Sequence, residues 1–192
     1  MFEMIKNSAP FLGLCNQTRN HLASASEPFR VHKGTVLQSA NQPWSKVYLL
    51  NRGLVRMYYA DLDGNEHNKR FFMDSDFFWP VTHALRTQPT GFFIETLTET
   101  EGYFWQFDAF QSSFSNDYEW LTFSHVWMEK LLEAKLTRER QWLQLTASER
   151  YIQFCQHSPK LAARLPAHQV ASYIGITPVS LSRLKKHLIV NI

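Results

Sequence analysis

The feature that most limits the fold of this chain is a run of 29 residues, 117–145, that contains neither glycine nor proline. Apolar side chains recur along it at helical spacings of three and four. A helix of this length extends ~40 Å at about 1.5 Å per residue, too far to lie wholly against a small neighbouring domain. We therefore expect one long helix over residues 116–145. Its first apolar stripe comprises Trp120, Phe123, Trp127, Leu131 and Ala134.

This helix has a second apolar stripe, formed by Leu121, Met128 and Leu132, so it has two faces to bury. One face would cover the preceding domain, and the other would meet a second copy of the chain in a coiled-coil-like seam. We predict a dimerisation helix and assign the first-stripe residues to it. A single core helix within a monomer is the alternative.

Before the long helix, residues 29–110 consist of short β-type runs separated by turn residues. Asn51-Arg52-Gly53 and Asp63-Gly64 each follow such a run, and Asn or Asp next to Gly accepts the positive φ of tight hairpin turns. This pattern predicts a β-sandwich or barrel of about eight strands. Residues 1–27 predict one or two short helices in front of it.

The composition excludes several classes of protein. With 44% hydrophobic and 19% charged residues, the chain is expected to fold. Its two cysteines are 140 positions apart and form no CxxC, so no thiolate metal site is expected within one chain. No apolar run approaches the ~20 residues that span a bilayer, and no signal region is evident. We predict a cytoplasmic protein without membrane association.

The sequence also contains no recognisable catalytic or metal-binding pattern. The eight histidines are scattered, without the His-x-His pair of a barrel metalloenzyme. The sequence also lacks GxSxG and a phosphate-binding P-loop. We predict a protein that is not an enzyme and that has no metal and no cofactor.

The net charge of +3 is unevenly distributed along the chain. Residues 1–137 contain 12 Lys and Arg against 15 Asp and Glu, whereas residues 138–192 contain 8 against 2. Such a split favours a basic C-terminal module that faces a polyanion. A merely solvated basic surface is the alternative.

Residues 165–186 indicate a helix, a turn and a second helix. Gly175 falls where the turn needs a left-handed residue, and Thr177-Pro178 supplies an N-cap and a first-turn proline. Leu181 and Leu184 would point inward, leaving an acid-free face for a DNA major groove. Arg183 could pair with guanine, while lysines and hydroxyls hold phosphates. The predicted DNA-binding residues are His168, Gln169, Thr177, Val179, Ser180, Ser182, Arg183, Lys185 and Lys186.

A capping box at Thr146-Ala147-Ser148-Glu149 begins the helix that precedes this motif. The β-type region, the long helix, the capped helix and the helix-turn-helix follow one another along the chain. In this order they resemble the Crp/Fnr family of bacterial transcription regulators, most specifically at residues 147–151 and 165–184. The resemblance implies an α+β fold in three parts. These are a double-stranded β-helix (jelly-roll or β-roll) sensor with N-terminal helices at 1–115, the dimerisation helix at 116–145, and a helix-turn-helix domain at 146–192. The wing is expected to be truncated or reduced to Leu188-Ile189-Val190.

The resemblance also implies a homodimeric transcription regulator that binds palindromic double-stranded DNA, with RNA polymerase as a further partner. Well-known members begin the recognition helix with Arg-Glu, where this chain has Pro178-Val179, so its operator should differ. The alternative function is a small-molecule-binding β-roll protein whose helix-turn-helix serves as a protein-interaction module.

The sensor segment departs from members that bind cyclic AMP. Those carry a Gly-Glu-Leu turn and then an Arg beside a small residue; this chain has Asp76-Phe77-Phe78-Trp79 and later residues 91–96. Arg86 is the only cation we expect nearby, and Asp76 and Glu95 would repel a phosphate, so we do not expect cyclic-nucleotide binding. The residues predicted to line an apolar effector pocket are Phe78, Trp79, Glu95, Thr96, Trp120 and Phe123; barrel core plus dimer seam is the alternative.

Overall fold

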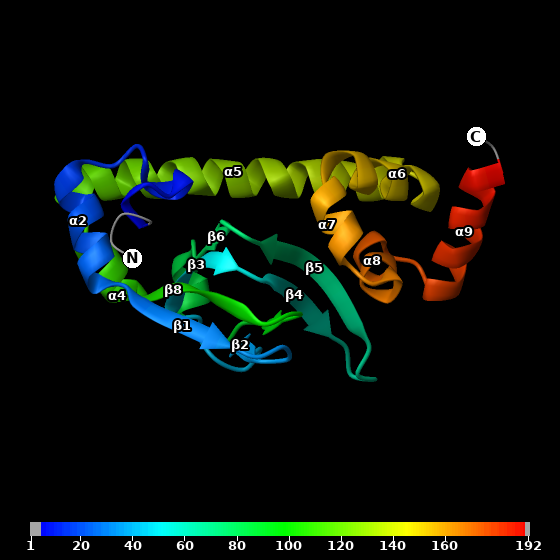
Figure 1. The fold of residues 1–192 in the computed structure, drawn as a ribbon, viewed down its shortest axis with the longest axis horizontal. Coiled ribbons are helices and arrows are strands. Elements are labelled where there is room, and N and C mark those ends of the chain that lie inside the picture. The colour runs from blue at the N-terminus through cyan, green and yellow to red at the C-terminus, as the bar shows by residue number, and fades with distance from the viewer. Residues whose placement is uncertain (1–4, 191–192) are drawn as a thin grey trace. The chain divides into compact units, whose positions relative to one another are not determined.

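The computed structural model describes residues 5–190 of the chain (Figure 1). The chain forms two compact units. The first contains the residues up to 57 together with 71–131, and the second contains 58–70 together with 132–192. Helix α5 (Asp117–Gln144) and strands β4 (Leu54–Ala60) and β5 (Glu66–Met73) each contribute residues to both units. Residues 58–70 thus belong to the same unit as the C-terminal helices, whereas we expected them within the sensor domain, residues 1–115.

Eight strands form two four-stranded sheets, so the predicted β-roll is confirmed. One sheet has the order β1-β8-β3-β6 and the other β2-β7-β4-β5. Strand β3 pairs antiparallel with both β8 and β6, with Tyr48 opposite Phe104 and Phe78. The remaining strands are β1 (Glu27–Val31), β2 (Val36–Gln38), β3 (Lys46–Arg52), β6 (Phe77–Phe78), β7 (Phe93–Thr96) and β8 (Thr100–Gln106).

Helices precede, interrupt and follow the strands. The predicted N-terminal helices are present, and the predicted long helix is confirmed as α5. The β-type region was predicted too broadly, because α3 and α4 are helical. The Thr82 hydroxyl caps α3 by accepting from the N–H of Leu85, and the helical spacing of Phe107 and Phe110 buries both rings on one side of α4. The elements are η1 (Ala9–Phe11), α2 (Asn16–Ala25), α3 (His83–Thr87) and α4 (Phe107–Ser112).

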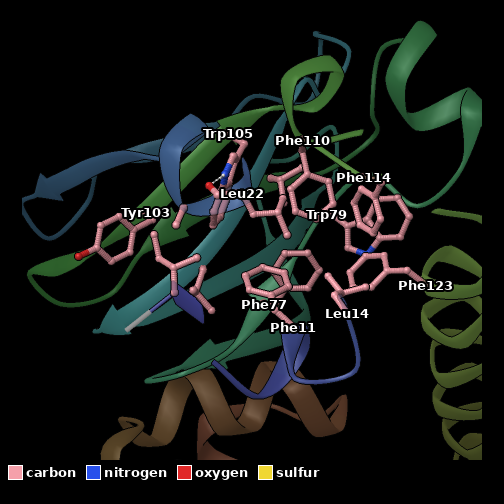
Figure 2. Packing of buried hydrophobic residues seen from close by; sticks show 14 of the residues in the cluster. Phe11, Leu14, Leu22, Phe77, Trp79, Tyr103, Trp105, Phe110, Phe114 and Phe123 are labelled. Carbon is pink, nitrogen blue, oxygen red and sulfur yellow. Dashed lines mark hydrogen bonds between the residues drawn. The ribbon is translucent and has the colours of Figure 1, made fainter. Parts of the chain in front are cut away.

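An aromatic core lies against the outer side of the first sheet (Figure 2). Trp105 is fully buried in it, and its indole N–H donates to the carbonyl of Leu22 on α2 at 2.8 Å. Phe123 of α5 enters this core and lies 6.0 Å from the ring of Phe77. Trp120 and Trp127 pack at its edge. Three residues of the first apolar stripe, Trp120, Phe123 and Trp127, therefore pack within their own chain, whereas the sequence assigned them to a dimer seam. Ala134 of the same stripe is exposed.

A second core fills the interior of the β-roll with side chains from both sheets. Phe78 stacks on Phe72 at 4.2 Å and on Tyr48 at 5.2 Å between ring centroids. Burial raises the pKa of the Tyr48 phenol. The buried members are Trp44, Tyr48, Leu50, Val55, Met57, Phe72, Phe78, Phe92 and Ile94.

The C-terminal helices are α6 (Ala147–His157), α7 (Pro159–Arg164), α8 (Ala167–Ile174) and α9 (Pro178–Val190). The predicted capping box is confirmed: Thr146 Oγ1 accepts from the N–H of Glu149, whose carboxylate accepts from the N–H of Thr146 at 2.8 Å. These bonds lower the pKa of the Glu149 carboxyl. The wing was expected to be truncated or reduced to residues 188–190; these residues form no wing strand, because they continue α9 as a helix. Across residues 5–190, no helix combines the length and hydropathy of a membrane span.

Candidate DNA-binding surface

The turn between α8 and α9 is built as the sequence predicts. Gly175 adopts φ 75° and ψ 40°, the left-handed conformation that ends α8. The N–H of Ile176 returns to the carbonyl of Ala171 at 3.0 Å. Thr177 Oγ1 accepts from the N–H of Ser180 at 3.1 Å and so caps the start of α9. Glycine at 175 and the threonine cap thus fix where one helix ends and the next begins.

One side of α9 packs inward, and the other is exposed. Leu181 is fully buried and Leu184 is half-buried, as predicted. Ser180, Arg183 and Lys186 are exposed on the opposite side. Because no Asp or Glu occurs from residue 165 onward, this face carries no acidic side chain. Val179, Ser182 and Thr177 are exposed as well.

Two of the predicted DNA-binding side chains are used inside the protein. Lys185 is half-buried, with its ammonium 5.6 Å from the centre of the Tyr151 ring. Gln169 is only 6% exposed, and its Oε1 accepts from Nδ2 of Asn68 at 2.7 Å. His168 beside it is exposed, with Nε2 3.2 Å from Nε2 of Gln169. The structure therefore separates Lys185 and Gln169 from the exposed group on α9.

Two arginines that anchor the helix-turn-helix were not assigned a role from the sequence. Arg138 of α5 donates to the carbonyl of Tyr173 at 2.9 Å, and Arg150 of α6 donates to that of Ile174 at 3.1 Å. Both guanidinium groups thus satisfy carbonyls at the negative end of α8. Arg150 also lies 4.7 Å from the centre of the Trp142 ring, and Arg138 lies 5.7 Å from it. Their wide sequence separation from the motif left no local signal for this function.

The six residues predicted to line an effector pocket lie in separate places. Trp79 packs 6.2 Å from Phe123 in the outer aromatic core (Figure 2), and the rings of Trp79 and Trp120 are 5.5 Å apart. Phe78 points instead into the filled interior of the β-roll. The Thr96 hydroxyl donates to the carbonyl of His32 at 2.7 Å. The structure brings three of these residues together and places the others elsewhere.

Charges in the β-roll differ from the sequence expectation. Glu95 accepts from Arg56 Nη2 at 2.6 Å and from Arg56 Nε at 3.0 Å, so a cation other than Arg86 lies in this region and offsets the carboxylate. The Arg56 side chain is only 7% exposed. Arg86 donates to the carbonyl of Pro80 at 3.0 Å and lies 4.4 Å from the Phe107 ring centre. Partial burial lowers the pKa of Arg86.

A pocket of about 530 Å³ lies between the N-terminal segment and the first half of α5. Phe123 is the one predicted effector residue that lines it, with Leu14, Val126 and Trp127. Cys15 also lines this pocket. The hydrogen bond with Ser115 is the largest single cause that lowers the pKa of its thiol, and hydrogen bonds with Thr18 lower it further. This pocket is mainly apolar and lies outside the β-roll interior.

The second apolar face of α5 is open to solvent in a single chain. Leu121 is 61% exposed and Leu132 is 57% exposed. The spacing of these residues along the helix, in steps of four and seven, is the pattern of a coiled-coil seam. The exposed apolar residues of this face are Leu121, Met128, Leu132, Leu136 and Leu143.

A β-roll, a long helix and a helix-turn-helix together define the fold of Crp/Fnr-type transcription regulators. The solved structures that share it include the following three. FixK2 from Bradyrhizobium japonicum is similar with a TM-score of 0.75 at 18% identity, covering 86% of this chain and 85% of its own. The global regulator CLP from Xanthomonas campestris, described as responsive to c-di-GMP, has a TM-score of 0.73 at 16% identity, with 91% of each chain covered. A putative Crp/Fnr-family regulator from Eubacterium rectale has a TM-score of 0.74 at 13% identity, covering 95% of this chain and 87% of its own.

No family model and no curated protein matches the chain. The likeness to the solved structures therefore establishes the fold, and the residues of the site must carry the functional argument.

Proposed function

We propose that this protein is a homodimeric transcription regulator that binds DNA in a sequence-specific way through α9. The observation that carries the proposal is the exposed, acid-free face of α9 with Ser180, Arg183 and Lys186 on it. A recognition helix needs such a face because donors must reach base edges and phosphates without repulsion. The fixed turn at Gly175 presents this face on a rigid support.

The exposed second stripe of α5 supports a homodimer. A row of leucines and a methionine open to water is stabilised when a copy of the same helix covers it. Two recognition helices could then enter major grooves one helical turn apart, ~34 Å centre to centre. Analytical ultracentrifugation tests this: Leu132→Glu should shift a dimer to monomer, whereas Thr137→Glu, on an exposed position outside the stripe, should not.

We propose that the β-roll does not hold a cyclic nucleotide in the usual way. Aromatic side chains fill its interior, and Arg56 is already paired with Glu95. Titration calorimetry with cyclic AMP should show no binding, and micromolar affinity would overturn this part of the proposal. The effector, RNA polymerase as a partner, and a cytoplasmic location stay predictions.

The central experiment selects bound duplexes from a random DNA pool and then measures variants on the selected duplex. Arg183→Ala should cost ~1–3 kcal/mol of binding free energy and relax preference at one base position in each half-site. Lys186→Ala should weaken binding to all duplexes and reduce the salt slope by ~1 per protomer. Lys160→Ala changes an exposed lysine on α7 and serves as the control.

The outcomes separate the two functions. Selection of a palindromic duplex supports DNA binding, while equal losses for Arg183→Ala on selected and random duplexes would argue against base reading by this residue. Failure to enrich any duplex would overturn the proposal and favour the helix-turn-helix as a protein-interaction module.

A further inference from the structure

The hairpin formed by the ends of β4 and β5, residues 58–70, makes a buried polar contact with α8. Asn68 is 4% exposed and Gln169 is 6% exposed. The Asn68 amide donates from Nδ2 to the backbone carbonyl of Gln169 at 3.1 Å and to its Oε1 at 2.7 Å. These residues are 101 positions apart, and both belong to the second compact unit.

Backbone groups of the hairpin strengthen this contact. The Ser172 hydroxyl accepts from the N–H of Asn68 at 2.9 Å and donates to the carbonyl of Glu66 at 2.9 Å. One side chain of α8 thus satisfies a donor and an acceptor of β5. Arg138 of α5 donates to the carbonyl of Tyr173 at 2.9 Å and lies 3.5 Å from that of Asn68. The hairpin, α5 and α8 are therefore joined at one place.

Such a contact favours one orientation of α8. Small displacements of α8 would leave the buried side-chain amides of Asn68 and Gln169 without these hydrogen bonds, which is more costly than the loss of exposed hydrogen bonds. The hydrogen bonds between the hairpin and α8 leave the exposed side of α9, with Arg183 and Lys186, open to solvent. The hairpin can therefore hold the helix-turn-helix while its DNA-facing side stays accessible.

We propose that Asn68 is a positioning residue for DNA recognition: its contact with α8 holds the helix-turn-helix in one orientation, so that the two copies in a dimer read half-sites at one fixed spacing. This inference rests on the proposed function. A bivalent protein with rigidly placed binding modules gains affinity only on a site of matching geometry. Loosening the modules reduces that gain and widens the range of acceptable spacings.

The test uses Asn68→Ala, which removes the side-chain bonds to Gln169, and Ser172→Ala, which removes the bonds to the backbone of Asn68 and Glu66. The control is Leu62→Ala, a fully exposed residue at the hairpin tip. Three probes are used: the selected palindromic duplex, a single half-site, and duplexes with one to five added spacer base pairs. Each contact variant should bind the palindrome about tenfold more weakly and tolerate altered spacers, with half-site affinity unchanged. The double variant should lose at least as much affinity for the palindrome as either single variant, and Leu62→Ala should lose none.

Two results would overturn the inference. Equal losses on half-site and palindrome would mean that the contact only stabilises the fold, and an unchanged spacing preference would mean that other contacts hold the orientation. If the wild type selects no duplex, the proposed function fails. Hydrogen exchange then decides on the contact itself: faster exchange of α8 amides in both variants supports a hairpin that holds α8, and unchanged exchange refutes it.

Discussion

Gly175→Ala tests whether the helix-turn-helix is held against the long helix by close packing at its turn. The residue has φ 75°, so an alanine would pay about 1–2 kcal/mol for the left-handed conformation. The new methyl group would also overlap Cη2 of Trp142 and lie 2.6 Å from its Cζ3. The Trp142 ring is 44% exposed, so it can move aside, but it then gives up its positions beside Arg138 and Arg150.

Giving up the two cation–π contacts costs a further ~1–2 kcal/mol, and alanine returns about 0.4–1 kcal/mol by restricting the unfolded chain. We therefore expect Gly175→Ala to lower the free energy of unfolding by about 2 kcal/mol. Gly64→Ala is the matched control, since Gly64 has φ 81° and no neighbour within 4 Å of the added carbon. This control should cost about 1 kcal/mol, from the conformational strain alone.

The assay is denaturant unfolding followed by circular dichroism, combined with hydrogen exchange of α8 and α9 amides, because the two units can unfold separately. Repeating Gly175→Ala in a Trp142→Ala background isolates the overlap. In that background the cost should fall to that of Gly64→Ala. Equal costs for the two glycine variants in the wild-type background, or a cost that persists without the Trp142 ring, would refute the reasoning.

Three further predictions concern other parts of the chain. Arg56→Met should lower the free energy of unfolding by about 1–3 kcal/mol because it leaves the half-buried Glu95 carboxylate without its ion-pair partner; a fall below about 0.5 kcal/mol in denaturant unfolding would contradict this. Hydrogen bonds with Asn65 lower the pKa of Asp61 from 3.8 to about 2. Their contribution to the stability of the hairpin is therefore present above pH 3.8 and is lost as the pH falls to about 2. An NMR titration should show that Asn65→Ala raises this pKa. Thr146→Ala should destabilise α6 by about 0.5–2 kcal/mol, measured by thermal unfolding against Thr137→Ala.

Local sequence signals predicted those parts of the protein that depend on neighbouring residues. The absence of glycine and proline from 117–145 gave α5, and Thr146 with Glu149 marked the start of α6. Gly175 and Thr177 located the turn before α9. Each of these features arises from hydrogen bonds or backbone conformations within a few residues, so the sequence pattern contains the whole interaction.

Helical periodicity by itself did not decide which face of α5 is buried. Both stripes are apolar, and only packing against the outer aromatic core distinguishes Phe123, which is 6% exposed, from Leu121, which is 61% exposed. The same limit explains α4, where the apolar residues of 107–110 fit a strand or a helix until their neighbours in space are known.

Local patterns in the sequence predicted the long helix, the helix-turn-helix and the exposed side of α9, because periodicity, caps and charge are local properties. How those parts are used depends on contacts between distant segments. The tertiary structure paired Arg56 with Glu95, occupied Gln169 with Asn68, and turned Lys185 toward Tyr151. The first two of these pairs join residues 39 and 101 positions apart. Such partners are chosen by the folding of the whole chain, and no local pattern contains them.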